Sequence, residues 1–318
     1  MKKIIIKKED SGKRLDIFLF ELIKKNSRSQ IKKMILGDMV TVNGEMPTVH
    51  RFLKEGDIVE IKEGELQNVS SKKKFIKSKL KSFGTEIFSK IKIIDDTPEY
   101  LVIEKPSGLL VHPTNKGETN TLVDWLIAKY PECRKIGEDP ARAAIVHRLD
   151  KEVSGLMVIP KTQDSFENIK RQFKLRTIDK KYLALVYGKI KNDSGEINFP
   201  IKRSSSKKGM FAALPIGADT GKKALTVYSV KERYKNYTLL EIEIMTGRTH
   251  QIRVHLLAIG HGIVGDPLYK NRGIKEKNTP NRIFLHAAEL GFTDLKGERH
   301  QYQSLLPQSL RDFLRKIK

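Results

Sequence analysis

A lysine-rich segment divides the chain and so limits what it can fold into. Across residues 66–91, acidic side chains are almost absent and lysines crowd together. Segments of this composition repel themselves and favour an extended tether over a packed core. We therefore predict a small folded part at residues 1–65 and a large one at residues 92–318, joined by residues 66–91. The lysines that define the tether are Lys72, Lys73, Lys74, Lys77, Lys79 and Lys81.

The charge of the whole chain favours a polyanionic partner. Its 318 residues include 61 Lys and Arg against 38 Asp and Glu, a formal net charge of +23 at pH 7. Each phosphate that such a surface neutralises releases counterions, so the composition points toward RNA. Membrane surfaces are also anionic, but the longest apolar runs fall far short of the roughly 20 residues that a span needs. The opening MKKIII lacks the apolar core of a signal peptide, so we expect a soluble cytoplasmic protein with no membrane partner.

The tether admits a second interpretation. Ile76, Leu80, Phe83 and Ile87 recur at helical spacing. Part of the segment could therefore fold into a basic amphipathic helix on contact with RNA. We favour a disordered tether in the free protein.

The residue types that usually hold metals and cofactors are sparse or badly spaced. Cys133 is the only cysteine, which excludes an intrachain disulfide and a cysteine-based zinc site. His250 and His255 are five residues apart and miss the spacing that brings two ligands onto one helical face, so each is expected to be a core or hydrogen-bonding histidine. No phosphate-binding glycine loop is present. We expect a reaction that needs neither a metal nor a cofactor.

Residues 12–61 carry the pattern of a small α/β unit. Apolar residues share one helical face ahead of a capping box at Ser27 and Gln30, and others point inward from a second helix that Gly37 ends. An alternating strand leads into Asn43-Gly44, a strong hairpin signal, and residues 58–61 supply another strand. The inward residues are Leu15, Phe18, Leu19, Leu22, Ile23, Ile31, Met34 and Ile35, with Val40 and Val42 in the alternating strand.

This small unit resembles the S4 RNA-binding module, whose second helix carries basic residues to RNA. Arg28, Lys32 and Lys33 occupy that helix in this chain. The resemblance implies that Arg28 and Lys32 contact RNA. The alternative is a basic helix surface that has no partner.

The large part is predicted to be built on a mixed, largely antiparallel sheet, which makes the chain an α+β protein. Residues 224–231 and 237–245 form its clearest strand pair, joined by a turn at Lys235-Asn236. Apolar residues alternate with glutamates along the second strand, so one face is expected to be buried. Strand-helix-strand units are too few for a doubly wound fold.

A helix is predicted around residues 166–173, with Phe166, Ile169 and Phe173 on its inner face. Its other side carries Lys170, Arg171 and Lys174. That basic side could line an RNA path, and plain surface solubility explains it equally well.

The segment HRLDKEVSGL, residues 147–156, has the pattern of a reactive loop. Residues 145–146 are expected to end one strand, Ser154-Gly155 to form a turn, and residues 156–159 to form the next strand. Asp150 then lies on a loop between two buried elements. A carboxylate beside fixed arginines stays ionised and can serve as a nucleophile or a base. The alternative is a solvated loop with a local ion pair.

HRLDKEVSGL resembles the catalytic motif of the RluA-type pseudouridine synthases, which isomerise uridine in structured RNA. Further segments resemble other motifs of this family in the same order, across roughly residues 92–300. Val153 departs from the usual threonine, and Lys270 stands where glycine is common. The matching segments are EKPSGLLVHPT at 104–114, KKYLALVYG at 180–188, TGRTHQIRVHL at 246–256, GDPLY at 265–269 and LHAAEL at 285–290.

The resemblance implies a pseudouridine synthase fold, with the active-site cleft across the middle of the sheet, and a role for each matching residue. Asp150 is the reactive carboxylate, and the sequence does not choose among attack on the sugar, attack on the base and removal of a ribose proton. Tyr182 stacks on the target base and assists proton removal, and Arg253, on a helix that begins near Thr249, pairs with Asp150. Arg148 fills the space that the flipped base vacates, and Arg248 is a candidate phosphate contact.

The S4-like unit and the full length favour a large-subunit ribosomal RNA substrate, either free or in an assembling ribosomal particle. That preference rests on analogy with the family. One alternative is the same chemistry on transfer RNA. Another is a catalytically silent, RNA-binding ribosome-assembly factor. We expect the protein to be a monomer.

Overall fold

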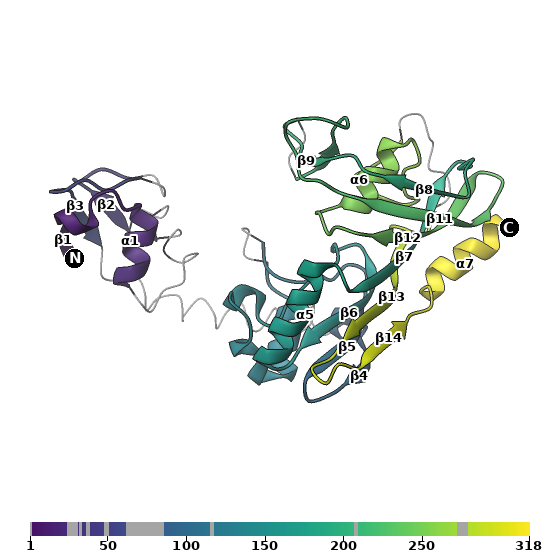
Figure 1. Cartoon of the computed structure of the whole chain (residues 1–318), viewed down its shortest axis with the longest axis horizontal. Helices are drawn as coiled ribbons and strands as arrows, with labels where there is room; N and C mark the ends of the chain where they lie inside the picture. Colours follow the sequence, from purple (N-terminus) through teal and green to yellow (C-terminus); the bar gives the residue numbers. More distant parts are fainter. Residues whose placement is uncertain are drawn as a thin grey trace. The chain divides into compact units, whose positions relative to one another are not determined.

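The computed structural model describes residues 2–23, 31, 34–35, 39–47, 51–61, 86–114, 118–206, 209–271 and 279–318 (Figure 1). The chain divides into two compact units, Met1–Lys81 and Ser82–Lys318. The predicted capping box, the basic residues Arg28, Lys32 and Lys33, and most of the predicted tether lie outside the described residues. At the end of the predicted tether, Ile87 and Phe88 pack against the core of the second unit.

The first unit combines a three-stranded antiparallel sheet with helical segments. Strands β1 (Lys2–Ile5), β3 (Ile58–Ile61) and β2 (Val40–Val42) lie in that order, and helix α1 (Leu15–Leu22) follows a 3-10 turn at Lys8–Asp10. The predicted inward positions are largely buried, although Leu22 is 37% exposed because α1 ends there. Sequence reasoning missed β1, because the apolar run after Met1 was weighed only as a signal peptide. The buried core of the unit is Ile6, Leu15, Phe18, Leu19, Ile31, Met34, Ile35, Val40, Val42, Leu53, Val59 and Ile61.

The predicted turn at Asn43-Gly44 is confirmed. Both residues have positive φ, 56° and 78°, as a type I′ hairpin turn requires. The Asn43 side chain also ties the turn to β3, since its Oδ1 accepts from the Ile58 amide at 2.7 Å and its Nδ2 donates to Asp57 at 2.8 Å.

The second unit is organised by one nine-stranded sheet within the described residues. Neighbouring strands are antiparallel except β6 and β13, which pair in parallel, so the predicted mixed, largely antiparallel sheet is confirmed. The order is β4 (Lys92–Asp96), β5 (Tyr100–Lys105), β6 (Ser154–Pro160), β13 (Leu285–Thr293), β7 (Asp179–Tyr187), β12 (Tyr237–Ile244), β11 (Thr226–Arg233) and β8 (Ser194–Ile197), with β14 (Arg299–Gln303) also on β13.

Shorter elements surround this sheet. They are α4 (Leu122–Lys129), α5 (Gln163–Leu175), α6 (Gln251–Ala258), α7 (Gln308–Ile317), 3-10 turns at Pro131–Lys135 and Pro140–Arg142, and a two-stranded sheet of β9 (Ile201–Arg203) and β10 (Phe211–Ala213).

No helix in the described parts of the chain combines the length and apolar character that a membrane crossing demands.

The central strands are covered on both faces, which explains their continuous apolar runs. Tyr100 and Val102 of β5 pack with Ile169 of α5 on one face, whereas Leu101 and Ile103 belong to the larger core on the other. Figure 1 shows α5 lying across β5 and β6. Helix α5 matches the helix predicted around residues 166–173.

The predicted pairing of residues 224–231 with residues 237–245 is also confirmed. Strands β11 and β12 pair antiparallel across Lys235-Asn236, where the Tyr234 amide donates to the carbonyl of Tyr237 at 2.8 Å. Leu240 and Ile242 are fully buried, while the glutamates between them are half-buried on the other face.

Two local predictions around the reactive loop are wrong. Residues 145–146 are not in a strand, and Ser154-Gly155 is not a turn but the start of β6. Gly155 has φ +127°, and an added Cβ would lie 2.3 Å from the carbonyl oxygen of Ala287. The glycine therefore permits the close parallel approach of β6 to β13, a long-range contact that a local turn signal does not reveal.

We predict that Gly155→Ala destabilises the second unit by about 3 kcal/mol or more, because a backbone clash adds to the unfavourable φ. Gly297→Ala is the control, since Gly297 also has positive φ, +88°, but nothing lies within 4 Å of its added Cβ. Backbone strain alone should cost it about 1 kcal/mol. Urea unfolding of both variants measures the difference, and equal losses would contradict the clash.

Candidate active site

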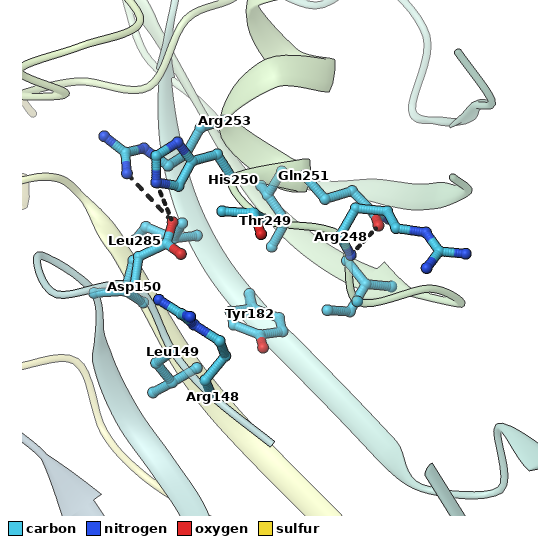
Figure 2. Close-up of a pocket in the computed structure, with 14 residues that line it drawn as sticks. Arg148, Leu149, Asp150, Tyr182, Arg248, Thr249, His250, Gln251, Arg253 and Leu285 are labelled. Carbon is cyan, nitrogen blue, oxygen red and sulfur yellow. Dashed lines mark hydrogen bonds and ion pairs between the residues drawn. The ribbon is translucent and has the colours of Figure 1, made fainter. Parts of the chain in front are cut away.

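One pocket gathers most of the predicted site residues. It holds about 540 Å³ of empty space and is formed by the loop before β6, by Tyr182 of β7, and by the segment that leads into α6. Asp150, Tyr182, Arg253, Arg148 and Arg248 all line it. Figure 2 shows the Asp150 carboxylate turned toward Arg253 and His250.

The loop that carries Asp150 is fastened through its backbone. The Val153 amide donates to the carbonyl of Asp150 at 3.1 Å, which closes a tight turn. The Gly108 amide donates to the carbonyl of Lys151 at 2.8 Å, and the Ser107 hydroxyl donates to the carbonyl of Glu152 at 2.5 Å. The segment after β5 therefore supports the reactive loop from one side.

Lys105 lies beneath this loop and is completely buried. Its ammonium group donates to the carbonyls of Pro106, Leu109 and Lys151 at 2.9, 2.8 and 3.3 Å. Burial lowers the pKa of Lys105 to about 7, against the opposing pull of the nearby charges on Asp150 and Glu152. The lysine links the segment after β5 to the loop of Asp150.

Arg253 is held by carboxylates from two separate segments. Its Nε and Nη2 each lie 2.8 Å from an oxygen of Asp266, and its Nη1 lies 3.2 Å from Asp150 and 3.6 Å from Glu152. Burial alone lowers the pKa of the guanidinium, but hydrogen bonding to Asp266 and its charge raise it overall. The two-point contact with Asp266 fixes the plane of the guanidinium, so Nη1 is presented to Asp150 in a set direction.

Asp266 is itself held in place. Both Leu268 and Tyr269 donate a backbone amide to its Oδ1, at 2.8 and 3.1 Å. The ring of Tyr269 lies 5.1 Å from the Arg253 guanidinium carbon. The GDPLY motif therefore positions Arg253.

His250 lies beside Arg253 and also approaches Asp150 (Figure 2). The Tyr269 hydroxyl accepts from the Phe211 amide at 2.9 Å and forms a second hydrogen bond with His250 Nδ1 at 2.8 Å. The other ring nitrogen of His250, Nε2, lies 3.9 Å from Asp150. Burial lowers the pKa of His250 in spite of the nearby carboxylate, so the ring is neutral at pH 7.

Tyr182 comes from the centre of the sheet. Its position on β7 directs the ring into the pocket, and the side chain is only 6% exposed. Burial raises the pKa of Tyr182, and the charge of Asp150 adds to the effect. Within the described residues its hydroxyl has no hydrogen-bond partner, so this oxygen is available to a ligand.

Arg148 is held at the rim of the pocket by His112. His112 Nδ1 lies 3.0 Å from the carbonyl of Pro113 and therefore carries the proton, which leaves Nε2 to accept from Arg148 at 3.2 Å. Burial lowers the pKa of His112, which keeps Nε2 unprotonated and able to accept this hydrogen bond.

Arg248 and His147 have local partners. Arg248 donates to the carbonyl of Lys223 at 3.1 Å. His147 accepts from the Val158 amide at 3.1 Å and stacks on Phe173, so it supports the local structure.

Sequence reasoning placed five residues in one pocket but did not assign the residues that orient them. Lys105, His112, Asp266 and Tyr269 lie in the quoted motifs, and His250 lies in TGRTHQIRVHL. Polar residues at these positions were the available signal, because buried polar side chains need partners. The predicted contacts Arg28 and Lys32 lie outside the described residues.

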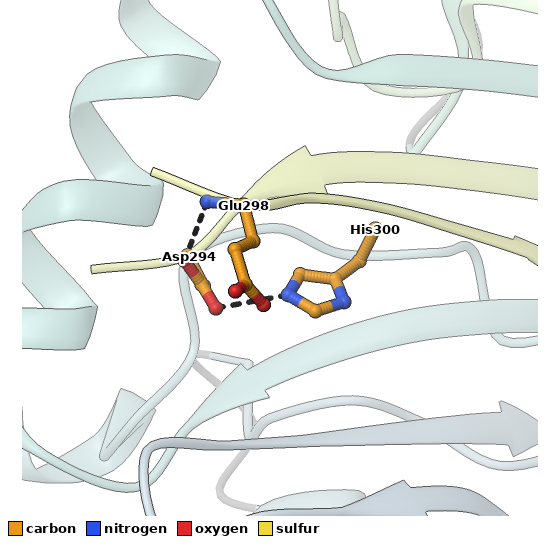
Figure 3. Close-up of side chains that lie close together, drawn as sticks. All are labelled: Asp294, Glu298 and His300. Atoms are coloured by element: carbon orange, nitrogen blue, oxygen red, sulfur yellow. Dashed lines mark hydrogen bonds and ion pairs between the residues drawn. The ribbon is translucent and has the colours of Figure 1, made fainter. Parts of the chain in front are cut away.

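A second cluster lies on the hairpin between β13 and β14. Asp294, Glu298 and His300 bring one ligand atom each within 4.8 Å of one another (Figure 3). Asp294 accepts from the Lys296 and Glu298 amides, both at 2.9 Å, and lies 2.9 Å from His300 Nε2. These hydrogen bonds within the turn explain why the three side chains lie close together.

Comparison with known proteins finds a family for each unit of the chain. Residues 99–258 match the model described as RNA pseudouridylate synthase, and residues 13–59 match the S4 domain. "Ribosomal large subunit pseudouridine synthase D" of Blochmanniella floridana is 37% identical over 271 residues, 85% of this chain and 79% of the relative. An "uncharacterized RNA pseudouridine synthase" of Aquifex aeolicus is 37% identical over 317 residues, 96% of this chain and 94% of the relative.

A solved structure agrees with the sequence matches. "Human RNA Pseudouridylate Synthase Domain Containing 1" is similar with a TM-score of 0.57 and 25% identity, over 72% of this chain and 95% of the human one. Together these findings confirm the resemblance inferred from the motifs and the predicted fold class.

We predict that Asp266→Asn destabilises the second unit by about 3 kcal/mol, because it leaves the buried Arg253 short of a counter-charge. Glu152→Gln is the control, since Glu152 lies near the same guanidinium but its side chain is 35% exposed. It should cost less than about 1 kcal/mol. Urea unfolding compares the two, and equal effects would contradict the central role of Asp266.

The buried Lys105 predicts a pH-dependent stability. In the unfolded chain its pKa returns to the ordinary 10.5, whereas in the folded protein it is about 7. Between these values the unfolded state binds more protons, so wild type should gain up to about 1.4 kcal/mol per pH unit relative to Lys105→Met as pH rises. Urea titrations between pH 7 and about 9 measure this, and a difference independent of pH would contradict it.

Proposed function

The chain belongs to the RNA pseudouridylate synthase family, and from that premise we propose that it isomerises specific uridines of large-subunit ribosomal RNA with Asp150 as the reactive carboxylate. One observation carries the assignment of the site. The Asp150 carboxylate lies in a pocket between Arg253, fixed by Asp266, and the ring of Tyr182.

The reaction asks three things of this pocket. The bond from ribose C1′ to N1 of the base must break, the base must turn, and a new bond must form through C5. No atom is gained or lost, so the proposal needs no redox or group-transfer cofactor. The site must stabilise charge, retain the free base and assist loss of the C5 proton.

Asp150 supplies the reactive charge. Arg253 Nη1 at 3.2 Å orients one carboxylate oxygen, and the position of Nη1 is set by Asp266 rather than by the substrate. Preorganisation of this kind lowers the cost of reaching the transition state. Attack on the sugar, attack on the base and removal of a ribose proton all begin from this arrangement.

Tyr182 holds the base in this proposal. Because burial and Asp150 raise its pKa, the phenol stays neutral near pH 7, and its ring offers a stacking surface. A neutral phenol also avoids repulsion with the adjacent carboxylate. Its hydroxyl, which has no partner among the described residues, can relay a proton at the base edge by passing on its own proton as it takes one up.

Arg148 assists entry of the base. Removing a uridine from its stack costs a few kcal/mol, about what a planar side chain can offset by filling the gap. The residue lines the pocket, and among the described residues the neutral His112 is the hydrogen-bond partner that holds it there. Arg148 can therefore leave this contact without breaking an ion pair.

The substrate assignment draws on the relatives and on the first unit. Relatives over most of the chain carry the name of a ribosomal large subunit pseudouridine synthase, and the S4 match supports a second contact with RNA. In the proposal, residues 1–65 bind RNA through Arg28 and Lys32, residues 66–91 connect them to the catalytic part at 92–318, and the protein acts as a cytoplasmic monomer. The same chemistry on transfer RNA is the alternative within this class.

A silent assembly factor is the competing function. A protein that only binds RNA gains nothing from a carboxylate in a basic cleft, since the charge repels phosphate. The ordered contacts of Asp150 with Arg253 and His250 therefore favour an active enzyme.

Tritium release from RNA labelled at uracil C5 tests the proposal. We predict that Asp150→Asn lowers release from large-subunit ribosomal RNA by at least about a thousandfold, because the reactive group is lost. Its RNA affinity should stay within about threefold of wild type, since no phosphate contact is removed. Asp164→Asn, an exposed position on α5 outside the pocket, is the control and should keep full activity.

The same assay separates the alternatives. Release from bulk transfer RNA but not from ribosomal RNA would reassign the substrate. Release from neither, with tight RNA binding, would favour the assembly factor or a substrate that is presented only in a ribosomal particle. An active Asp150→Asn variant would remove Asp150 from the mechanism.

A further inference from the structure

A second, larger hollow adjoins the catalytic pocket. It holds about 1360 Å³ of empty space and is formed by the end of α5, the start of β7, and residues 142–148 and 245–248. Arg148, Tyr182 and Arg248 line both hollows, so they form the shared boundary. We call this second hollow the α5 groove.

The α5 groove is lined by cations and by no acidic side chain. Three of them, Lys174, Arg176 and Lys180, form no ion pair with a carboxylate in the described residues. Arg148 and Arg248 are held by a neutral ring and a backbone carbonyl rather than by acids. The groove therefore concentrates positive charge that the protein itself leaves uncompensated.

Lys180 shows that the uncompensated positive charge is electrostatically unfavourable. Its Nζ lies 4.9 Å from the centre of the Phe173 ring, and burial lowers its pKa to about 8. The half-buried ring of His147 stacks on Phe173 and is neutral, because desolvation and the nearby Lys180 charge lower its pKa. A half-buried cation that has no counter-ion in the described residues is unfavourable, and an anionic ligand in the groove would reduce that penalty.

The helix end explains only part of the pattern. Cations at the carboxyl end of a helix are stabilised by its dipole, which accounts for Lys174 and for Arg176 at the C-cap of α5. It does not account for Lys180 on β7 or Arg248 before α6, which reach the same hollow from other elements. Convergence from separate elements indicates a binding surface.

We propose that the α5 groove binds the phosphodiester backbone of the RNA segment next to the target uridine, through Lys174, Arg176 and Lys180. The inference rests on the proposed function, because the uridine must occupy the adjoining pocket. An RNA strand that enters that pocket past Arg148 and Arg248 meets the groove directly. Phosphate oxygens supply the negative charge that the groove lacks.

Helix α5 itself provides the matched control. Lys170 pairs with Glu138 and lies 3.8 Å from Glu167, and Arg171 contacts Asn168, so neither lines the groove. Lys174 and Arg176 are exposed within it. The double variants Lys174→Gln/Arg176→Gln and Lys170→Gln/Arg171→Gln therefore remove the same charge from α5 and its C-cap.

The test measures tritium release from large-subunit ribosomal RNA, and RNA affinity by filter binding, between about 50 and 200 mM KCl. For Lys174→Gln/Arg176→Gln, KM should rise about tenfold or more while kcat stays within about twofold, because ground-state contacts are lost. The slope of log affinity against log salt should fall by about 0.7 for each lost phosphate contact. The Lys170→Gln/Arg171→Gln control should match wild type in both.

Equal losses in the two double variants would overturn the proposal, since general charge would then explain the effect. An unchanged KM and salt slope in Lys174→Gln/Arg176→Gln would overturn it as well. If wild-type protein releases no tritium, the proposed function fails, and the same comparison of salt slopes by filter binding still decides whether the groove binds RNA.

Discussion

The guanidinium of Arg253 connects Asp266 to Asp150, and the other contacts of the site depend on its position. Asp266 fixes its plane through two hydrogen bonds of 2.8 Å, and the remaining nitrogen reaches Asp150 at 3.2 Å. A buried arginine between two carboxylates is stable only when every hydrogen bond is made. The same requirement that keeps this arginine buried therefore keeps the carboxylate of Asp150 in place.

Contacts beneath the pocket also hold the loop that carries Asp150. Lys105 binds three backbone carbonyls, one of them Lys151 in the loop itself, and Gly155 lets β6 approach β13 directly after it. Neither residue touches the pocket. Both show that the shape of the site is set by backbone contacts in the centre of the sheet.

Charge is distributed unevenly around this rigid centre. The pocket of Asp150 contains the ion pair of Asp150 with Arg253, whereas the α5 groove beside it contains cations such as Lys174 and Lys180 that form no ion pair with a carboxylate in the described residues. The balanced region suits chemistry, because its charges are already oriented. The unbalanced region suits binding of an anion, because its charge is neutralised only when a ligand arrives.

Local pattern determined much of this protein. Alternation along β12, helical spacing in α1 and α5, and the Asn43-Gly44 turn follow from residues close in sequence, and the motifs identified Asp150, Tyr182 and Arg253. Only the tertiary structure decided that β6 begins at Ser154, that Asp266 seats Arg253, and that Lys174 lines a groove while Lys170 does not. The physical reason is that these features depend on contacts between distant segments, which spacing along the chain does not encode.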